Sequence, residues 1–183
     1  MSAPRPRLPG DPPPDAVVER ILRVDHAGEY GAARIYAGQL AVLGQHHPLS
    51  GEIGRMAAQE KTHLKHFDEL LAERGIRPTV LQPVWAVAGH ALGAATALLG
   101  PKAAMACTAA VEDEIDAHYS EQLAALGESD PELSASIKRF QADEREHRDI
   151  ALAAGAEATP GYPLLYSAIR TGCRIAIELS KRI

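Results

Sequence analysis

Two copies of the pattern Glu-x-x-His stand where their side chains could bind a metal ion. Glu60 and His63 lie three residues apart, and so do Glu144 and His147. On a helix this spacing puts the carboxylate and the imidazole on one face. A lone pair of this kind is more often part of a solvated helix face than of a site. The second copy, in the other half of the chain, favours a metal site.

Both pairs interrupt an apolar helix face. Residues at steps of three and four flank the first pair (Ile53, Met56, Phe67, Leu70) and the second (Leu133, Ile137, Phe140, Ala151, Ala154). Such spacing is typical of a helix packed in a bundle. Ligand-type side chains therefore occupy positions where an ordinary bundle has leucine.

Glu29 and Glu112 interrupt the apolar faces of two further helices in the same way. The chain thus uses a helix pair twice, first with a single Glu and then with Glu-x-x-His. This ligand set is the signature of ferritin-like di-iron and di-manganese carboxylate bundles. The pattern predicts an all-α, ferritin-like four-helix bundle with the ligands Glu29, Glu60, His63, Glu112, Glu144 and His147.

The chemistry of this donor set narrows the choice of metal ion. Four buried carboxylates without cations would each cost several kcal/mol of desolvation. Two divalent ions balance that charge. An oxygen-rich set with two imidazoles suits iron or manganese, whereas structural zinc prefers a tetrahedral Cys/His site. We expect two iron ions per chain.

Two neighbours of Glu29 leave alternatives open. His26 lies on the same helix face one turn earlier. Three roles are open for it: a metal ligand, a hydrogen-bond donor to a ligand, or a packed histidine. Asp25 lies beside that face, where it would orient an imidazole from a neighbouring helix.

Length and composition predict one domain. The 183 residues are 46% hydrophobic, which is enough for one good core. Residues 1–14 are proline-rich, and we expect a disordered arm followed by one domain at 15–183. Asp15, Ser50 and Asp130 are expected helix N-caps, with Gly75 just past a helix end. Pro131, directly after Asp130, strengthens that start signal.

Residues 84–100 lack Asp, Glu, Lys and Arg, and they join the two halves. Three interpretations are open: a buried crossover helix, an interfacial helix and a short membrane span. Glycines at 75, 89, 93 and 100 would let another helix approach closely. Residues 164–183 predict an additional C-terminal amphipathic helix with Arg170, Arg174, Lys181 and Arg182. This helix lies either on a membrane surface or against the bundle.

Charge and cysteine content exclude several classes. The net charge of −5 gives no basic surface for nucleic acid. Cys107 and Cys173 are too few for a disulfide framework, which indicates a reducing compartment and core or interface positions. No apolar signal segment stands at the N-terminus, and no G-x-G-x-x-G motif indicates a nucleotide domain.

Beyond these patterns, the sequence resembles the demethoxyubiquinone hydroxylases of ubiquinone biosynthesis from about Arg20 onward. The resemblance rests on "RVDHAGEYGAARIYAGQ", "EKTHLKHF", "ALGAATALLG", "AMACTAAVE", "HY" and "GCRIAI". It implies the same six ligands as the spacing. It also implies roles beside the site or in electron delivery for His118, Tyr119 and Arg174. The chain lacks the presequence of eukaryotic members, so it resembles the bacterial type.

The resemblance implies O2-dependent ring hydroxylation of a polyprenyl demethoxyubiquinol. It implies electrons from NADH, directly or through a reductase, and peripheral attachment to the cytoplasmic face of the cell membrane. A reductase, a biosynthetic complex or an oligomer would be its protein partners. Three alternatives compete: a ferritin-type iron store, a di-iron tRNA hydroxylase and a non-catalytic membrane-docking bundle. The net charge argues against the tRNA enzyme, and the four carboxylates are unexplained in a docking bundle.

Overall fold

A computed structural model describes residues 14–182 of the chain. Within that range it contains helices and no strand, so the all-α prediction is confirmed. The elements are α1 (Pro14–Leu43), α2 (Ser50–Glu73), α3 (Gln82–Leu98), α4 (Pro101–Leu126), α5 (Pro131–Ala153), the short 3₁₀ helix η1 (Ala156–Ala158) and α6 (Tyr162–Ser180). Of the predicted arm at residues 1–14, residues 1–13 lie outside the described part, and the prediction is wrong for Pro14, which begins α1.

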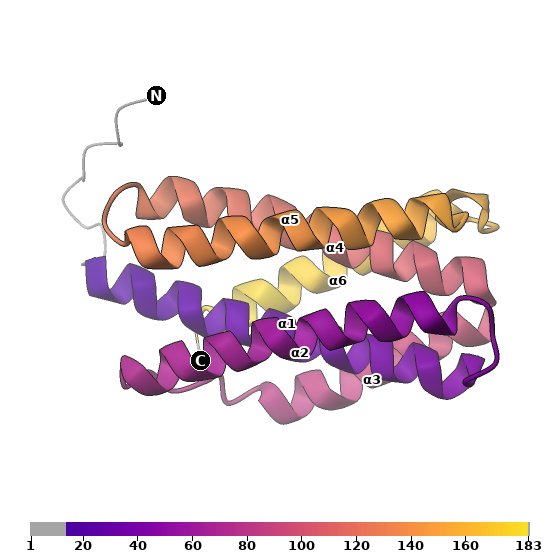
Figure 1. The fold of residues 1–183 in the computed structure, drawn as a ribbon, viewed down its shortest axis with the longest axis horizontal. Helices are drawn as coiled ribbons and strands as arrows, with labels where there is room; N and C mark the ends of the chain where they lie inside the picture. Colours follow the sequence, from indigo (N-terminus) through magenta and orange to yellow (C-terminus); the bar gives the residue numbers. More distant parts are fainter. Residues whose placement is uncertain (1–13, 183) are drawn as a thin grey trace.

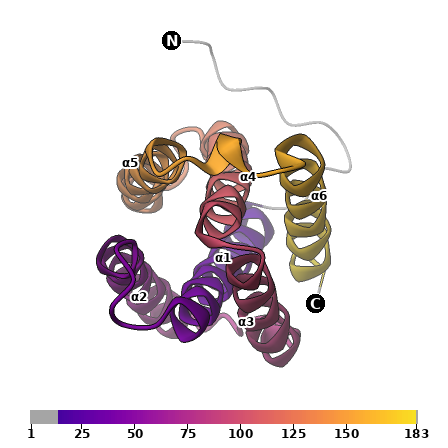
Figure 2. The same cartoon turned by 90° about the vertical axis from the view of Figure 1, so that its right-hand side faces the viewer.

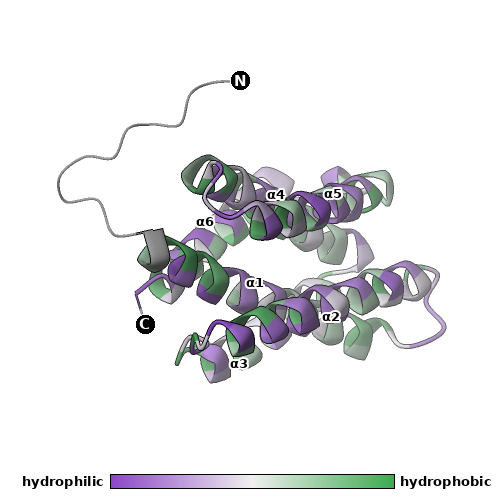
Figure 3. Ribbon diagram, turned by 60° about the vertical axis from the view of Figure 1, so that its left-hand side comes forward, coloured by the Kyte–Doolittle hydropathy of each residue, from purple (hydrophilic) through white to green (hydrophobic). Residues whose placement is uncertain are grey.

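Four helices, α1, α2, α4 and α5, form the predicted bundle (Figure 1). Seen from one end, α1 and α2 lie on one side, and α4 and α5 on the other (Figure 2). The two remaining helices lie outside this core, with α3 packed on α1 and α6 packed on α4. Hydrophilic and hydrophobic residues alternate along the helices (Figure 3), as expected when each helix turns one face inward.

Apolar side chains fill the bundle in two layers. One cluster includes Leu22, Phe67, Leu133, Ile137 and Phe140. The other includes Ile53, Met56, Met105, Ala109 and Ala151. The predicted ligand positions fall between these layers along each helix, so hydrophobic packing closes the middle of the bundle at both ends.

The crossover helix α3 is only half buried. Gly89 and Gly93 are buried against α1, and Ala97 is buried as well, whereas Val84, Val87 and Leu98 are exposed. A Cβ at Gly93 would stand 1.9 Å from the carbonyl oxygen of Ile35, so the two helices meet backbone to backbone. The expected close approach therefore holds for Gly89 and Gly93. Gly75 and Gly100 instead lie at helix ends, with φ of +65° and +122°.

The helix ends agree with most of the expected signals. Asp130 caps α5 by accepting a hydrogen bond from Leu133 N at 3.0 Å, with Pro131 in the first turn. Ser50 does not cap α2 as expected. It is the first helical residue, and its hydroxyl donates to Gly44 O at 2.6 Å. The helix α1 begins at Pro14, so Asp15 lies inside it rather than before it.

The C-terminal helix α6 turns Ile169 and Ser180 toward the bundle. Three of its cationic side chains form ion pairs. Arg170 and Arg174 both pair with Glu114 of α4, and Lys181 pairs with Glu178. Across residues 14–182, no helix combines the length and hydropathy needed to cross a bilayer.

Candidate metal centre

The six predicted ligands come together in the middle of the bundle. They form two groups, one of Glu29, Glu60, His63 and Glu144, the other of Glu60, Glu112, Glu144 and His147. Within each group, one donor atom per residue lies within 4.8 Å of the others. Glu60 and Glu144 belong to both groups. This arrangement suits two metal ions held side by side with two shared carboxylates.

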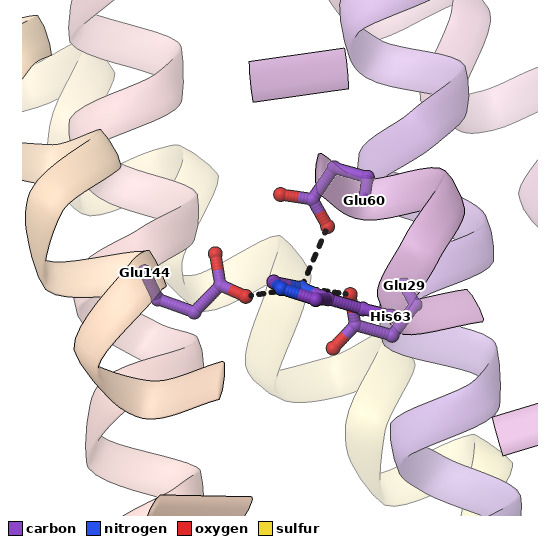
Figure 4. Close-up of side chains that lie close together, drawn as sticks. All are labelled: Glu29, Glu60, His63 and Glu144. Atoms are coloured by element: carbon purple, nitrogen blue, oxygen red, sulfur yellow. Dashed lines mark ion pairs between the residues drawn. The ribbon is translucent and has the colours of Figure 1, made fainter. Parts of the chain in front are cut away.

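Helices distant in sequence supply neighbouring atoms. Nδ1 of His63 on α2 lies 3.3 Å from Glu29 of α1 and 3.2 Å from Glu144 of α5 (Figure 4). Nδ1 of His147 lies 3.1 Å from both Glu60 and Glu144. All six residues are buried, and Glu60 and Glu144 are 0% exposed. The centre is therefore shielded from bulk water.

The carboxylate oxygens show that this donor set fits metal ions. Each of the four glutamates has at least one buried oxygen with no hydrogen-bond partner in the described part of the chain, and Glu60 has two. A buried, unsatisfied carboxylate is costly, and a cation removes that cost. The oxygen-rich set with two imidazoles fits iron or manganese better than a structural zinc ion.

Burial and mutual repulsion set the protonation of the carboxylates. Burial, and then the charge of Glu144, raises the pKa of Glu60 and of Glu112 well above the usual value. Burial acts in the same direction on Glu144, but hydrogen bonds from His147 and His63 outweigh it and lower the pKa of that carboxyl. The two shared carboxylates thus differ in proton affinity before any metal binds.

Each imidazole is held through its outer nitrogen. Nε2 of His63 lies 3.0 Å from Asp143, and Nε2 of His147 lies 3.1 Å from Oε1 of Gln59. A proton on Nε2 leaves Nδ1 free to face the centre as a ligand. Burial opposes protonation of His63, but the carboxylates of Glu144 and Glu29 raise its pKa to about 10.

Two buried tyrosines hold the two glutamates that belong to single groups. Tyr36 OH donates to Glu112 at 2.6 Å, and Tyr119 OH donates to Glu29. Burial, and then the charge of the bonded glutamate, raises the pKa of both phenols well above the usual value. Both tyrosines therefore remain protonated donors.

The sequence reasoning missed Tyr36, Gln59 and Asp143 as site residues. A signal was present. Gln59 and Asp143 each directly precede the Glu of a Glu-x-x-His pair, and each holds the histidine of the other pair. Tyr36 and Tyr119 each stand two helical turns after Glu29 or Glu112. Reading the two halves side by side would have shown both repeats.

The residues next to Glu29 lie outside the two groups. His26 is buried, and its Nε2 lies 2.9 Å from Asp68, a half-exposed residue of α2. The expectation that Asp25 orients an imidazole is wrong. Its carboxylate accepts a hydrogen bond from the amide of Gln122 instead. The orienting carboxylate for His63 is Asp143.

Of the three further residues implied by the resemblance, the structure brings one to the centre. Tyr119 contacts Glu29 directly. His118 lines a separate cavity of about 240 Å³ with Gln122 and Lys181, where burial lowers its pKa. Arg174 lies on α6, and its Nε and Nη2 each donate a 2.9 Å hydrogen bond to the carboxylate of Glu114. The roles of His118 and Arg174 stay predictions.

Comparison with known proteins identifies the family. The profile of the family described as "Ubiquinone biosynthesis protein COQ7" matches residues 16–180. A 3-demethoxyubiquinol 3-hydroxylase of Rhodospirillum rubrum is 55% identical over 177 residues, covering 97% of this chain and 84% of that protein. The human mitochondrial NADPH-dependent 3-demethoxyubiquinone 3-hydroxylase is 55% identical over 172 residues, covering 92% of this chain and 79% of that protein.

A more distant relative, the mitochondrial 5-demethoxyubiquinone hydroxylase of Saccharomyces cerevisiae, is 39% identical over 184 aligned positions, covering 92% of this chain and 79% of that protein. The family match at residues 16–180 includes all six clustered residues. The chain therefore belongs to the COQ7 family of ubiquinone biosynthesis proteins.

Proposed function

We propose that this protein is a di-iron monooxygenase that hydroxylates the ring of a demethoxyubiquinol-type polyprenyl quinol. The observation that carries the proposal is the pair of buried groups sharing Glu60 and Glu144. The names of the relatives support the substrate class. In the overall reaction, one oxygen atom of O2 enters a ring C–H bond. Two electrons and two protons convert the other atom to water.

Glu29 and His63 would hold one iron, Glu112 and His147 the other, and Glu60 and Glu144 both. When bound, the two irons supply the O2 activation that the hydroxylation requires. The surrounding residues orient the ligands. Asp143 and Gln59 fix the imidazoles, and Tyr36 and Tyr119 fix the two unshared carboxylates. Apolar layers on either side keep water out of the centre.

An apolar cavity beside the centre fits the substrate. It has a volume of about 550 Å³ and lies between α1, α3, α4 and α6. Among residues 14–182, no charged side chain lines it. Two of its residues, Gly28 and Val111, directly precede the ligands Glu29 and Glu112. A quinol ring entering here would lie next to the metal centre, with its prenyl tail along the aliphatic wall.

The exposed surface of α3 and α6 supports a peripheral membrane location. Large aliphatic side chains are exposed on both helices and at their ends (Val84, Val87, Leu98, Leu99, Leu164, Ile175, Leu179). Both helices also line the cavity, so a lipid surface against them would deliver a membrane-dissolved quinol to its entrance. We place the protein on the cytoplasmic face of the cell membrane. A nicotinamide cofactor, directly or through a reductase, would supply the electrons.

The test is turnover of the purified iron-loaded protein with a demethoxyubiquinol, O2 and a reduced nicotinamide. We expect a hydroxylated ring, with the new oxygen atom derived from ¹⁸O2. Glu112→Ala should abolish turnover while far-UV circular dichroism stays unchanged. An iron store would instead oxidise many ferrous ions per chain and leave the quinol unchanged, a result that would overturn the proposal.

A further inference from the structure

Three glycines line the apolar cavity without a packing reason to be glycine. They are Gly28 and Gly31 on α1 and Gly172 on α6. A Cβ built on any of them meets no heavy atom within 4 Å. None has a positive φ. Glycine inside a helix is unfavourable because its unfolded backbone has more freedom to lose. Alanine would therefore fit each position and stabilise its helix.

Other helical glycines of this region do have a packing reason. A Cβ at Gly38 would stand 2.2 Å from the carbonyl oxygen of His90, and one at Gly89 would stand 2.9 Å from that of Gly31. Those contacts force glycine because α1 and α3 touch through their backbones. The open space at Gly28, Gly31 and Gly172 is the cavity itself.

We propose that Gly28, Gly31 and Gly172 are specificity-determining residues that keep the cavity wide enough for the quinol ring and its prenyl tail. This inference rests on the proposed function and deepens it. Gly28 lines the cavity and directly precedes Glu29 on α1, so the cavity wall there lies one residue from a ligand. Gly172 is exposed on α6, so it borders the outer part. Side chains at the inner glycines would obstruct the ring, and one at the outer glycine would obstruct the tail.

The chain carries its own binding probe. Trp85 is its one tryptophan, it lines the same cavity, and its Nε1 donates to Ser180 Oγ at 3.0 Å. Quinones quench indole fluorescence at short range. Titration of the full-length iron-loaded protein with a decyl-tailed benzoquinone therefore measures binding without requiring turnover. The same benzoquinone without a tail separates ring binding from tail binding.

The experiment compares substitutions at Gly31 and Gly172 with a matched control. Gly54 on α2 also has no heavy atom within 4 Å of a built Cβ, but it does not line the cavity. We expect Gly31→Ala and Gly54→Ala each to raise Tm by about 1–4 °C. Gly31→Leu should raise the Kd of the decyl benzoquinone by about tenfold or more, whereas Gly54→Leu should leave it unchanged. Gly172→Leu should weaken binding of the tailed compound and not of the tailless one.

Three results would overturn the inference. The first is that Gly31→Leu binds the decyl benzoquinone as tightly as the native protein does. The second is that Gly31→Ala lowers Tm, and the third is that the native protein shows no saturable quenching of Trp85. Gly31→Ala keeps the test valid if the leucine variant does not fold. Saturable quenching of a native protein that never hydroxylates the quinol would contradict the proposed function and leave the role of the glycines intact.

Discussion

Tyr36 on α1 donates a 2.6 Å hydrogen bond to the carboxylate of Glu112 on α4. Tyr119 on α4 makes the reciprocal contact, to Glu29 on α1. Each helix pair therefore donates a tyrosine hydrogen bond to a glutamate of the other pair. Each pair also supplies the partner of the other pair's histidine. This pseudo-symmetry links the two halves of the chain at the site.

Tyr36→Phe is expected to lower iron affinity by roughly tenfold, because a hydrogen bond to a charged, buried carboxylate is lost. Tyr119→Phe should have a similar effect through Glu29. Competition with a ferrous chelator measures both. The control is Tyr30→Phe, because the Tyr30 hydroxyl contacts Arg34 at the surface. Unchanged affinity in both site variants would contradict the role of the tyrosines.

Asp143→Ala should weaken iron binding by about 10–100-fold, since His63 then loses the acceptor that orients its ring. Asp143→Asn, which keeps an acceptor oxygen, should recover part of that loss. Asp149→Ala, on the same helix but paired with Arg148, should bind iron normally. Metal analysis after dialysis against a graded chelator series distinguishes these outcomes. Equal affinity of the alanine and native proteins would refute the assignment.

The shared glutamates should differ from the unshared ones in metal stoichiometry. Glu60→Ala or Glu144→Ala removes a donor from both groups, so we expect both irons to be lost together. Glu112→Ala affects one group, and it should retain more iron than the other two variants. Iron per chain, measured on protein with unchanged helical content, checks this. Retention of two irons in Glu60→Ala would exclude a shared role.

Removal of the metal should reverse the effect of a substitution at Glu60. In chelated protein, Glu60→Gln removes a carboxyl whose ionised form is disfavoured by burial and then by the charges of Glu144 and Glu29, so its Tm should exceed that of chelated native protein. With iron added, the order should invert, because only the native centre gains stability from both ions. The same order of Tm values in both conditions would contradict a metal-balanced carboxylate cluster.

Asp130 should contribute a pH-dependent part of the stability. Burial favours its neutral form, but the hydrogen bond from Arg74 outweighs this and lowers the pKa. The contribution is therefore present above the unfolded value of about 3.9 and is lost as pH falls through the folded pKa. Asp130→Ala should cost about 1–2 kcal/mol at pH 7 by removing the cap.

Asp130→Asn separates the charge from the cap in the same test. It keeps a capping oxygen and should cost about 0.2–1 kcal/mol at pH 7, the range for a solvent-screened ion pair. Urea unfolding at pH 7 and at pH 3 measures both variants. The difference between native protein and Asp130→Asn should shrink at pH 3. A difference independent of pH would show that the ion pair with Arg74 contributes nothing.

The membrane location predicts co-flotation with liposomes containing anionic lipid. Replacement of Val87 and Leu98 by serine removes apolar surface without touching the bundle, and it should abolish flotation while Tm changes little. High salt should weaken binding only in part, because Arg170 and Arg174 are engaged with Glu114. Native protein that stays at the bottom of the gradient would refute the location.

The amino-acid sequence by itself determined the helices and the face that each turns inward. Periodicity is a local property, so the steps of three and four around Glu29, Glu60, Glu112 and Glu144 were enough to place four carboxylates inside one bundle. The Asp130–Pro131 signal and Gly75 likewise act within one helical turn, and the structure has both as expected.

Only the tertiary structure decided which side chains meet. Whether Glu60 or Glu29 is shared, and whether Asp143 or Asp25 holds His63, depends on the axial register of helices far apart in the sequence. The same register pairs Arg174 with Glu114 and leaves one side of α3 exposed. Periodicity along one helix gives the direction of a side chain, but the neighbouring helix fixes its partner.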